Sequence, residues 1–433
     1  MFNYRKIRKS AKAVILSLCM LFCLLACSFN GVFFNETQEI APVAASYPSS
    51  DTPDSIILTM ASDPATMQTV NWRTHGENTL GRVRYREISL GNEAPYAEKT
   101  AAFRRLETPE ITDDPVNSRF TVTLENLKPG TAYEYWVGNG DAGTWTGPYR
   151  FTTAPPKGVP FTFMFVGDFQ EGLSGTAVML TEVAQKYPET GFYMAAGDFA
   201  NSGSNRNDWD QMIGEARNVW ANYALAPTLG NHDLSGHNST APRMYFHYFS
   251  LPSNGPADLP PGHAYGFAYG DAYFFVLDSN DKLLVQREWL AQQLQQPEIK
   301  QYKWKIVMLH HPVYNIKASR KNMLIHDMFL PVFDEYGVDL VLNGHDHGYM
   351  RSKVLYNGAE VKDGQPGTVY VVSNAGGKIY SVEHIRSKAA LTIGGMQMYQ
   401  KIDIDTDDNG NARLNFKAYD AAHNLVDEFT LVK

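Results

Sequence analysis

The chain has 433 residues, of which 44% are hydrophobic and 19% are charged, a composition that excludes a disordered or fibrous protein. Its formal net charge is −8, so its surface repels polyanions and we expect no nucleic-acid partner. A chain of this length exceeds one ordinary hydrophobic core, which predicts two domains behind an export segment.

Residues 1–27 have the pattern of a signal peptide. Basic residues precede an apolar run from Ala13 to Cys27, which is too short for a membrane-spanning helix. The sequence Leu24-Leu25-Ala26-Cys27 resembles a bacterial lipoprotein cleavage box, in which Cys27 would carry a lipid anchor. Ordinary cleavage near Val43-Ala44-Ala45, giving a secreted protein, and an uncleaved anchor are the alternatives. We therefore expect an exported protein, either extracellular or attached to the cell envelope.

The cysteines restrict the chemistry of the mature protein. All three, Cys19, Cys23 and Cys27, lie in the leader, so the mature chain has no internal disulfide and no thiolate metal site. Any metal must therefore bind to oxygen and nitrogen donors. Residues 28–54, which become rich in proline and serine, are predicted to be a linker.

Residues 55–153 alternate apolar and polar positions in short runs, a pattern that predicts a β-sandwich. Trp72 and Tyr133, the latter after the turn Lys128-Pro129-Gly130-Thr131, resemble the core tryptophan and the tyrosine corner of fibronectin type III domains. We expect both rings to pack in the core and not to bind a ligand. The proline-rich residues 154–158 mark the end of this domain.

Residues 159–433 have an α/β pattern. Apolar runs predict buried strands, and longer periodic segments between them predict helices. The predicted strands are Phe161–Val166, Gly191–Ala196, Ala272–Leu277, Lys305–Leu309 and Val338–Leu342. The predicted helices are Ala177–Lys186, Asp208–Tyr223 and Val285–Leu294. The alternating segment Tyr399–Lys433 should add strands to an edge or to a second sheet.

Polar motifs follow apolar runs along this domain, and open α/β sheets place their sites at such strand ends. The motifs are Gly167-Asp168, Gly197-Asp198, Gly230-Asn231-His232-Asp233, His310-His311-Pro312 and Gly344-His345-Asp346-His347. Carboxylates, an amide oxygen and imidazoles are accepted ligands of borderline-hard cations. Their number suits two metal ions.

This ordered series resembles that of the calcineurin-like metallophosphoesterases. Together with the fibronectin-like module and the sequence from Gly344 to Arg351, it is similar to the purple acid phosphatases over roughly residues 55–433. The resemblance implies a two-domain protein of mixed α+β and α/β class, in which an N-terminal fibronectin III-like sandwich precedes a four-layer α/β/β/α metallophosphoesterase domain.

The resemblance also implies a binuclear metal centre of iron, manganese or zinc. Asp198 would bridge the two ions. One ion would take Asp168, Asp198 and His347, and the other would take Asp198, Asn231, His310 and His345. His232 would stabilise the developing charge or protonate the leaving oxygen, and Asp233 would orient His232.

Two positions depart from the family pattern. Purple acid phosphatases have a tyrosine three residues after the bridging aspartate, where this chain has Asn201, so the protein should not be purple. Most other metallophosphoesterases have a histidine two residues after the first aspartate, where this chain has Gln170. Gln170, Asn201 or water would complete the first metal site.

Three further residues are candidates for substrate binding. Arg320 and Lys317 lie in the loop after the fourth motif, and either could bind the ester phosphate or be a solvated loop charge. His311 could contact the substrate, or it could hold the metal ligands in place without contacting the substrate.

The expected function is hydrolysis of small phosphate monoesters by metal-activated hydroxide, as in acid phosphatases. A phosphodiesterase acting on cyclic nucleotides or lipid head groups is an alternative, and a non-catalytic surface-binding protein is an alternative from another class. Homodimerisation rests on the family resemblance alone.

Overall fold

The computed structural model describes residues 43–141, 143–236, 244–317, 320, 322–362, 364–382 and 387–433. The signal peptide, the lipid attachment at Cys27 and most of the linker were predicted for residues that lie outside this set. Within the described residues, none of the helices combines the length and the apolar character needed to cross a bilayer. Residues Ala44–Lys433 form one compact unit.

The N-terminal part is built of strands in two sheets. β1 (Asp54–Thr59), β2 (Gln68–His75), β6 (Val116–Leu124) and β5 (Ala102–Glu107) pair in that order, and β4 (Ala97–Thr100), β3 (Arg82–Glu87), β7 (Ala132–Gly138) and β8 (Thr146–Thr152) form the second sheet. Trp72 is buried and stacks on Phe120 with 5.3 Å between ring centroids. The Tyr133 hydroxyl accepts the Lys128 backbone N–H at 2.9 Å. Both rings thus pack in the core, as expected.

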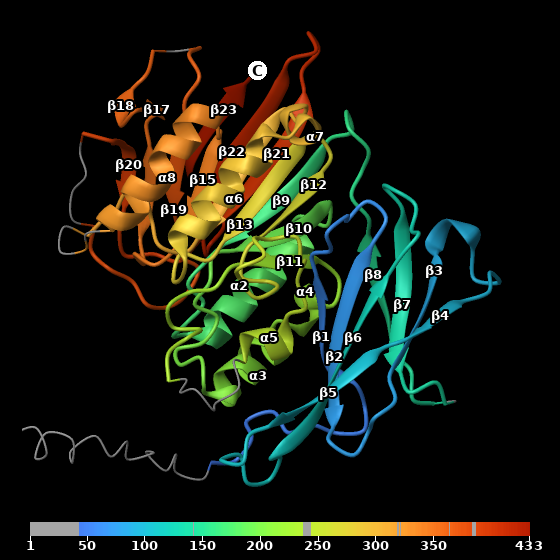
Figure 1. Ribbon diagram of the computed structural model, residues 1–433. Helices are drawn as coiled ribbons and strands as arrows, with labels where there is room; N and C mark the ends of the chain where they lie inside the picture. The colour runs from blue at the N-terminus through green and yellow to red at the C-terminus, as the bar shows by residue number, and fades with distance from the viewer. Residues whose placement is uncertain are drawn as a thin grey trace, which may run out of the picture. The chain divides into compact units, whose positions relative to one another are not determined.

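Two large sheets form the rest of the molecule (Figure 1). The first contains β9 (Phe161–Val166), β10 (Thr190–Ala195) and β11 (Ala224–Pro227), extended at one edge by β21 (Met398–Thr406), β22 (Ala412–Asp420) and β23 (Leu425–Val432). The second is ordered β12 (Tyr265–Tyr269), β13 (Ala272–Leu277), β14 (Trp304–Leu309), β15 (Leu340–Asn343), β19 (Val369–Val372), β16 (Tyr349–Ser352) and β20 (Ala389–Ile393). A small ribbon pairs β17 (Leu355–Tyr356) with β18 (Ala359–Glu360). The C-terminal strands extend a sheet edge, as predicted.

Helices cover the outer faces of both sheets, which gives the four layers that were expected. α2 (Leu173–Lys186), α3 (Arg206–Glu215), α4 (Arg217–Trp220) and α5 (Tyr245–Tyr248) pack on the first sheet, and α6 (Leu283–Gln295), α7 (Pro297–Lys300) and α8 (Met323–Tyr336) pack on the second. Alternation along β9 explains this arrangement. Phe163 and Phe165 face the core between the sheets, whereas Met164 and Val166 face the helices.

The N-terminal strands and the first large sheet are continuous. β1 pairs in parallel with β11 through Thr59 and Leu225, and the Met60 N–H donates to the Leu225 carbonyl at 2.9 Å. The Tyr135 hydroxyl adds a hydrogen bond of 2.7 Å to the Ala221 carbonyl. A single ten-stranded sheet therefore runs through both parts of the chain.

Some helices differ from the sequence expectation. The helix predicted over Asp208–Tyr223 is divided into α3 and α4 at Ala216. α8 was not predicted, and it contains Pro331, a residue that lacks a backbone donor and usually ends helices. Burial of its apolar face on the second sheet outweighs this local cost.

Candidate active site

The five motifs converge because each follows a parallel strand. β9, β10 and β11 lie side by side in the first sheet, and β14 and β15 lie side by side in the second. Their carboxyl ends deliver the polar side chains to one place, where two groups of potential metal ligands form. The groups are Asp198, His310 and His345, and Asp168, Asp198 and His347. Asp198 belongs to both.

Tight loop geometry brings these side chains together. Asp168, Asp198, His345 and His347 all have positive φ angles, of 53°, 53°, 70° and 45°. Such conformations cost about 1–3 kcal/mol each in non-glycine residues and occur mainly where function requires them. A Cβ at Gly344 would lie 2.5 Å from Asp168 Oδ2, so only glycine permits this approach.

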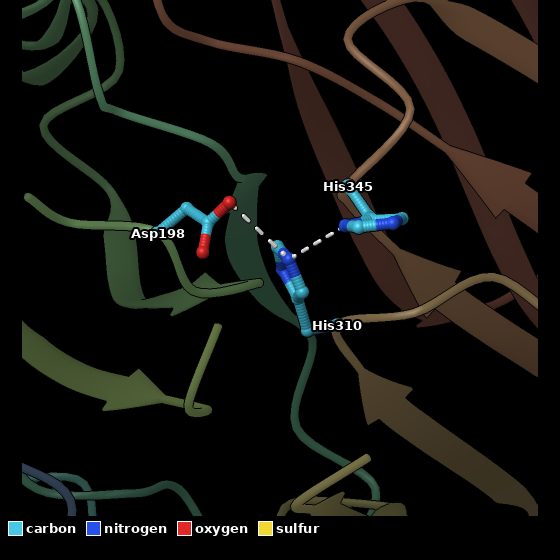
Figure 2. Close-up of side chains that lie close together, drawn as sticks. All are labelled: Asp198, His310 and His345. Carbon is cyan, nitrogen blue, oxygen red and sulfur yellow. Dashed lines mark hydrogen bonds and ion pairs between the residues drawn. The ribbon is translucent and has the colours of Figure 1, made fainter. Parts of the chain in front are cut away.

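His310 lies at the centre of one group (Figure 2). Its Nδ1 lies 2.6 Å from the Ala196 carbonyl and must donate to it, which leaves Nε2 as an unprotonated donor atom for a cation. Nε2 lies 3.1 Å from Asn231 Oδ1, 3.2 Å from His345 Nδ1 and 3.3 Å from Asp198 Oδ2. Asn231 Oδ1 thus lies next to this group.

The other group has the same construction. His347 Nδ1 lies 2.9 Å from the Lys378 carbonyl, so its Nε2 faces the site, 3.9 Å from Asp168 Oδ1. Asp198 Oδ2, between the groups, is buried and accepts no hydrogen bond within the part of the chain that the structure describes. A buried carboxylate oxygen without a donor, flanked by imidazole nitrogens, fits two cations that share one ligand.

The charges of the site also favour bound cations. Burial, and then the neighbouring Asp198, raise the pKa of Asp168 well above its usual range. Burial alone would lower the pKa of His310, but Asp198 outweighs it and raises that pKa to about 9. Burial lowers the pKa of His347 to about 4. Asp198 contributes to the raised pKa of both Asp168 and His310, and a bound cation would compensate its negative charge and take the place of the proton on His310 Nε2.

His232 and Asp233 have separate roles in the structure. The His232 backbone N–H donates to Asp198 Oδ1 at 2.8 Å, and its Nδ1 lies 2.7 Å from the Asn201 carbonyl. The buried Asp233 carboxylate accepts the N–H groups of Asp198, Phe199 and Gly230 at 2.9, 2.8 and 2.8 Å. The Asn201 carbonyl therefore orients the His232 ring, and Asp233 ties the second and third motifs together.

Comparison with known proteins agrees with this geometry. Residues 161–349 match the calcineurin-like phosphoesterase family, and residues 53–153 match the purple acid phosphatase N-terminal domain. The chain carries a calcineurin-like metallophosphoesterase domain. The resemblance inferred from the motif order is thereby confirmed.

Curated proteins that this chain resembles include plant enzymes. A purple acid phosphatase of Glycine max is 28% identical over 256 residues, covering 54% of this chain and 53% of the relative. The Fe(3+)-Zn(2+) purple acid phosphatase 12 of Arabidopsis thaliana is 25% identical over 253 residues, covering 54% of this chain and 52% of the relative. The chain thus spans about half the length of these curated relatives.

A solved structure shows the same fold. The purple acid phosphatase from yellow lupin (Lupinus luteus) seeds superposes with a TM-score of 0.71, covering 89% of this chain and 75% of that chain, at 16% identity. The expected architecture, a β-rich N-terminal domain followed by a layered α/β domain, is confirmed.

The predicted substrate-binding residues of the metallophosphoesterase domain differ in their surroundings. Arg320 Nη1 donates to the His345 carbonyl at 2.6 Å and to Asp346 Oδ1 at 2.7 Å, so this guanidinium holds the loop of the fifth motif. The Lys317 amino group lies 3.4 Å from the centre of the Tyr380 ring. The centre of that ring lies 4.7 Å from the centre of the His347 ring, so Lys317 lies near the potential metal ligands.

His311 packs against the potential metal ligand His345 and is held by a residue that the motifs did not indicate. Its ring centroid lies 4.3 Å from that of His345. Ser279 Oγ accepts the His311 backbone N–H at 3.0 Å and lies 2.8 Å from His311 Nδ1. The signal for Ser279 was its position: Asp278-Ser279-Asn280 directly follows β13, and Asn280 Nδ2 donates to the Leu229 carbonyl at 3.1 Å beside the third motif.

Proposed function

We propose that this protein is a binuclear metal-dependent phosphohydrolase that cleaves small phosphate monoesters. The observation that carries the proposal is the shared Asp198, which belongs to two ligand groups, and within each group the donor atoms lie within 4.8 Å of one another. Two bound cations would activate a water and neutralise charge on the phosphoryl oxygens. The metallophosphoesterase domain and the acid phosphatase relatives support the same chemistry.

The residues that would hold the cations are divided here as the family resemblance implies. One ion would bind Asp168, Asp198 and His347, and the other would bind Asp198, Asn231, His310 and His345. These donors are oxygens and nitrogens, which suit iron, manganese and zinc. A relative is named as an iron–zinc enzyme, which supports the same range of metals.

His232 is placed to handle a proton. Because the Asn201 carbonyl can only accept, His232 Nδ1 carries a hydrogen and Nε2 is left to hold or release a proton at the leaving oxygen. The ring is partly exposed and its backbone is fixed on Asp198, so it stands beside the metal ligands and within reach of solvent. Protonation of the leaving oxygen at this atom would lower the barrier to ester cleavage.

Two side chains would contact the ester phosphate. Ser279 Oγ already accepts the His311 backbone N–H, and its own proton has a partner if His311 Nδ1 accepts it. His311 Nε2 would then carry a hydrogen that can be donated to a phosphoryl oxygen. Lys317, which lies over the Tyr380 ring, would add a positive charge at the edge of the active site.

Hydrolysis is tested with a chromogenic aryl phosphate. We expect turnover that EDTA abolishes, that added manganese, zinc or iron restores, and that Asp198→Asn removes. Asp408→Asn, an exposed turn residue, is the matched control and should be unaffected. Full activity after exhaustive metal removal would refute the proposal. Assaying an aryl diester on the same preparation separates a monoesterase from a diesterase.

We also propose that the protein is exported. The basic and apolar pattern of residues 1–27 supports this, with Cys27 as the lipid-bearing residue. The intact mass of the protein isolated from its native cells tests it. A chain beginning at Cys27 with added acyl mass indicates a lipoprotein, and one beginning near Ala45 indicates free secretion. The mass of the whole chain from Met1 would contradict cleavage.

A further inference from the structure

Gln170 lies beside the first ligand group, Asp168, Asp198 and His347. This group has three proposed protein donors, whereas the second has four. Gln170 follows Asp168 by two residues and is fully buried. Its backbone N–H donates to the Asp198 carbonyl at 3.0 Å, which fixes it beside both carboxylates. Its side-chain Nε2 lies 3.0 Å from His347 Nε2, the ring nitrogen that faces the site. The amide therefore adjoins the ligand atoms of the first group.

The other atom of this amide has no partner. Gln170 Oε1 is buried and accepts no hydrogen bond among the described residues. Native proteins rarely leave a buried amide oxygen in this state, because its desolvation is not compensated. The oxygen and nitrogen of an amide occupy nearly the same space, so a half-turn of the last torsion exchanges them. That half-turn would bring Oε1 to the side of His347 Nε2.

We propose that Gln170 Oε1 is the fourth protein donor of the first metal site and that this site is built for a divalent ion. The inference rests on the proposed binuclear centre. Asn201 stands at the position of the family tyrosine, and the amide oxygen of Gln170 carries no negative charge, so this site has no phenolate to stabilise a trivalent ion. Neutral hard oxygen donors suit divalent ions such as Mn²⁺.

Asn201 is the other residue that differs from the family pattern, and it has a different role. It is exposed, its backbone N–H donates to Asp208 Oδ2 at 3.1 Å, and its carbonyl lies 2.7 Å from His232 Nδ1. Its side chain makes no hydrogen bond to the described residues. Substitution of the Asn201 side chain is therefore a matched control for substitution of Gln170.

The test measures metal binding and does not depend on turnover. The full chain is stripped of metal with EDTA, and Mn²⁺ is titrated by calorimetry, with electron paramagnetic resonance to detect a coupled manganese pair. We expect two Mn²⁺ ions per wild-type chain. Gln170→Ala should weaken one site about tenfold or more and leave the other unchanged, and Asn201→Ala should match wild type. Gln170→Glu, which adds a negative charge in the same shape, should tighten the same site.

The outcomes separate the two proposals. If wild type binds two ions and both Gln170 variants bind them with wild-type dissociation constants, Gln170 is not a ligand and only this inference fails. If wild type binds fewer than two Mn²⁺ or Zn²⁺ ions, the binuclear centre itself fails. Should Gln170→Ala not fold, Gln170→Glu carries the test alone, because it is nearly isosteric, and weaker binding in that variant would overturn the inference.

Discussion

Arg73 on β2 donates through Nη1 to Asp210 Oδ2 on α3 at 2.7 Å, and both side chains are buried. The Asp210 carboxylate also accepts hydrogen bonds from Arg206 Nε at 3.0 Å, from the Tyr248 hydroxyl and from Arg119 Nη2 at 3.4 Å. Arg73 and Arg119 belong to the N-terminal strands, whereas Arg206 and Tyr248 belong to the metallophosphoesterase domain. One carboxylate thus balances arginines from both parts of the chain.

Asp210→Asn should destabilise the protein by roughly 3 kcal/mol, because Arg119 loses its paired carboxylate, whereas Arg73 keeps Asp54 and Arg206 keeps Asp114. Chemical denaturation measures this change in the free energy of unfolding. Glu98→Gln, which removes the exposed ion pair with Arg82, is the control and should have almost no effect. Equal stability of Asp210→Asn and wild type would mean that the arginines are solvated in the folded protein.

The same residue predicts a dependence of stability on pH. Burial alone would raise the pKa of Asp210, but Arg73, Arg119 and Arg206 outweigh it and lower that pKa. A lowered folded-state pKa contributes stability above the unfolded value, about 4, and this contribution is lost as the pH falls further. Below about pH 4, wild type should therefore lose stability more steeply than Asp210→Asn. Urea midpoints between pH 3 and 7 measure the two slopes, and parallel curves would contradict the assignment.

Gly230→Ala should impair the active site, because a Cβ at this position would overlap Asp198 Oδ1. A displacement of the Asp198 carboxylate, the proposed bridging ligand, by about 1 Å is expected to lower kcat/KM roughly 100-fold. Elemental analysis of the purified variant should show reduced metal content. Gly175→Ala is the matched control: a Cβ there meets nothing within 4 Å, and alanine favours helix α2. Wild-type activity of Gly230→Ala would show that the loops have room to separate.

Ser279→Ala should raise KM for an aryl phosphate about fivefold to tenfold with little change in kcat, since His311 loses the hydroxyl that fixes its ring. Ser279→Thr keeps that hydroxyl and should restore most of the affinity. Inorganic phosphate, measured as a competitive inhibitor, should follow the same order across the three proteins. If threonine is as harmful as alanine, side-chain volume and not the hydrogen bond decides the effect.

Much of the site could be predicted because its residues directly follow buried strands. Phe161–Val166 and Ala272–Leu277 have the bounds read from the sequence, and buried parallel strands are its clearest signal. The role of Asp233 was not predictable, because two of its three backbone N–H partners, those of Asp198 and Phe199, belong to a loop 35 and 34 residues away. Ser279 was missed for a similar reason, since its contact with His311 arises only when β13 and β14 pair.

The pairing of β1 with β11 bears on any attempt to study the metallophosphoesterase domain alone. Truncation before residue 159 would remove β1 and leave β11 paired with β10 alone, which exposes an unpaired strand edge close to the third motif. Such an edge can pair with strands of other chains, so the shortened protein should precipitate or form oligomers. The N-terminal strands therefore protect the edge of the first large sheet, and the metallophosphoesterase domain should not be expressed without them.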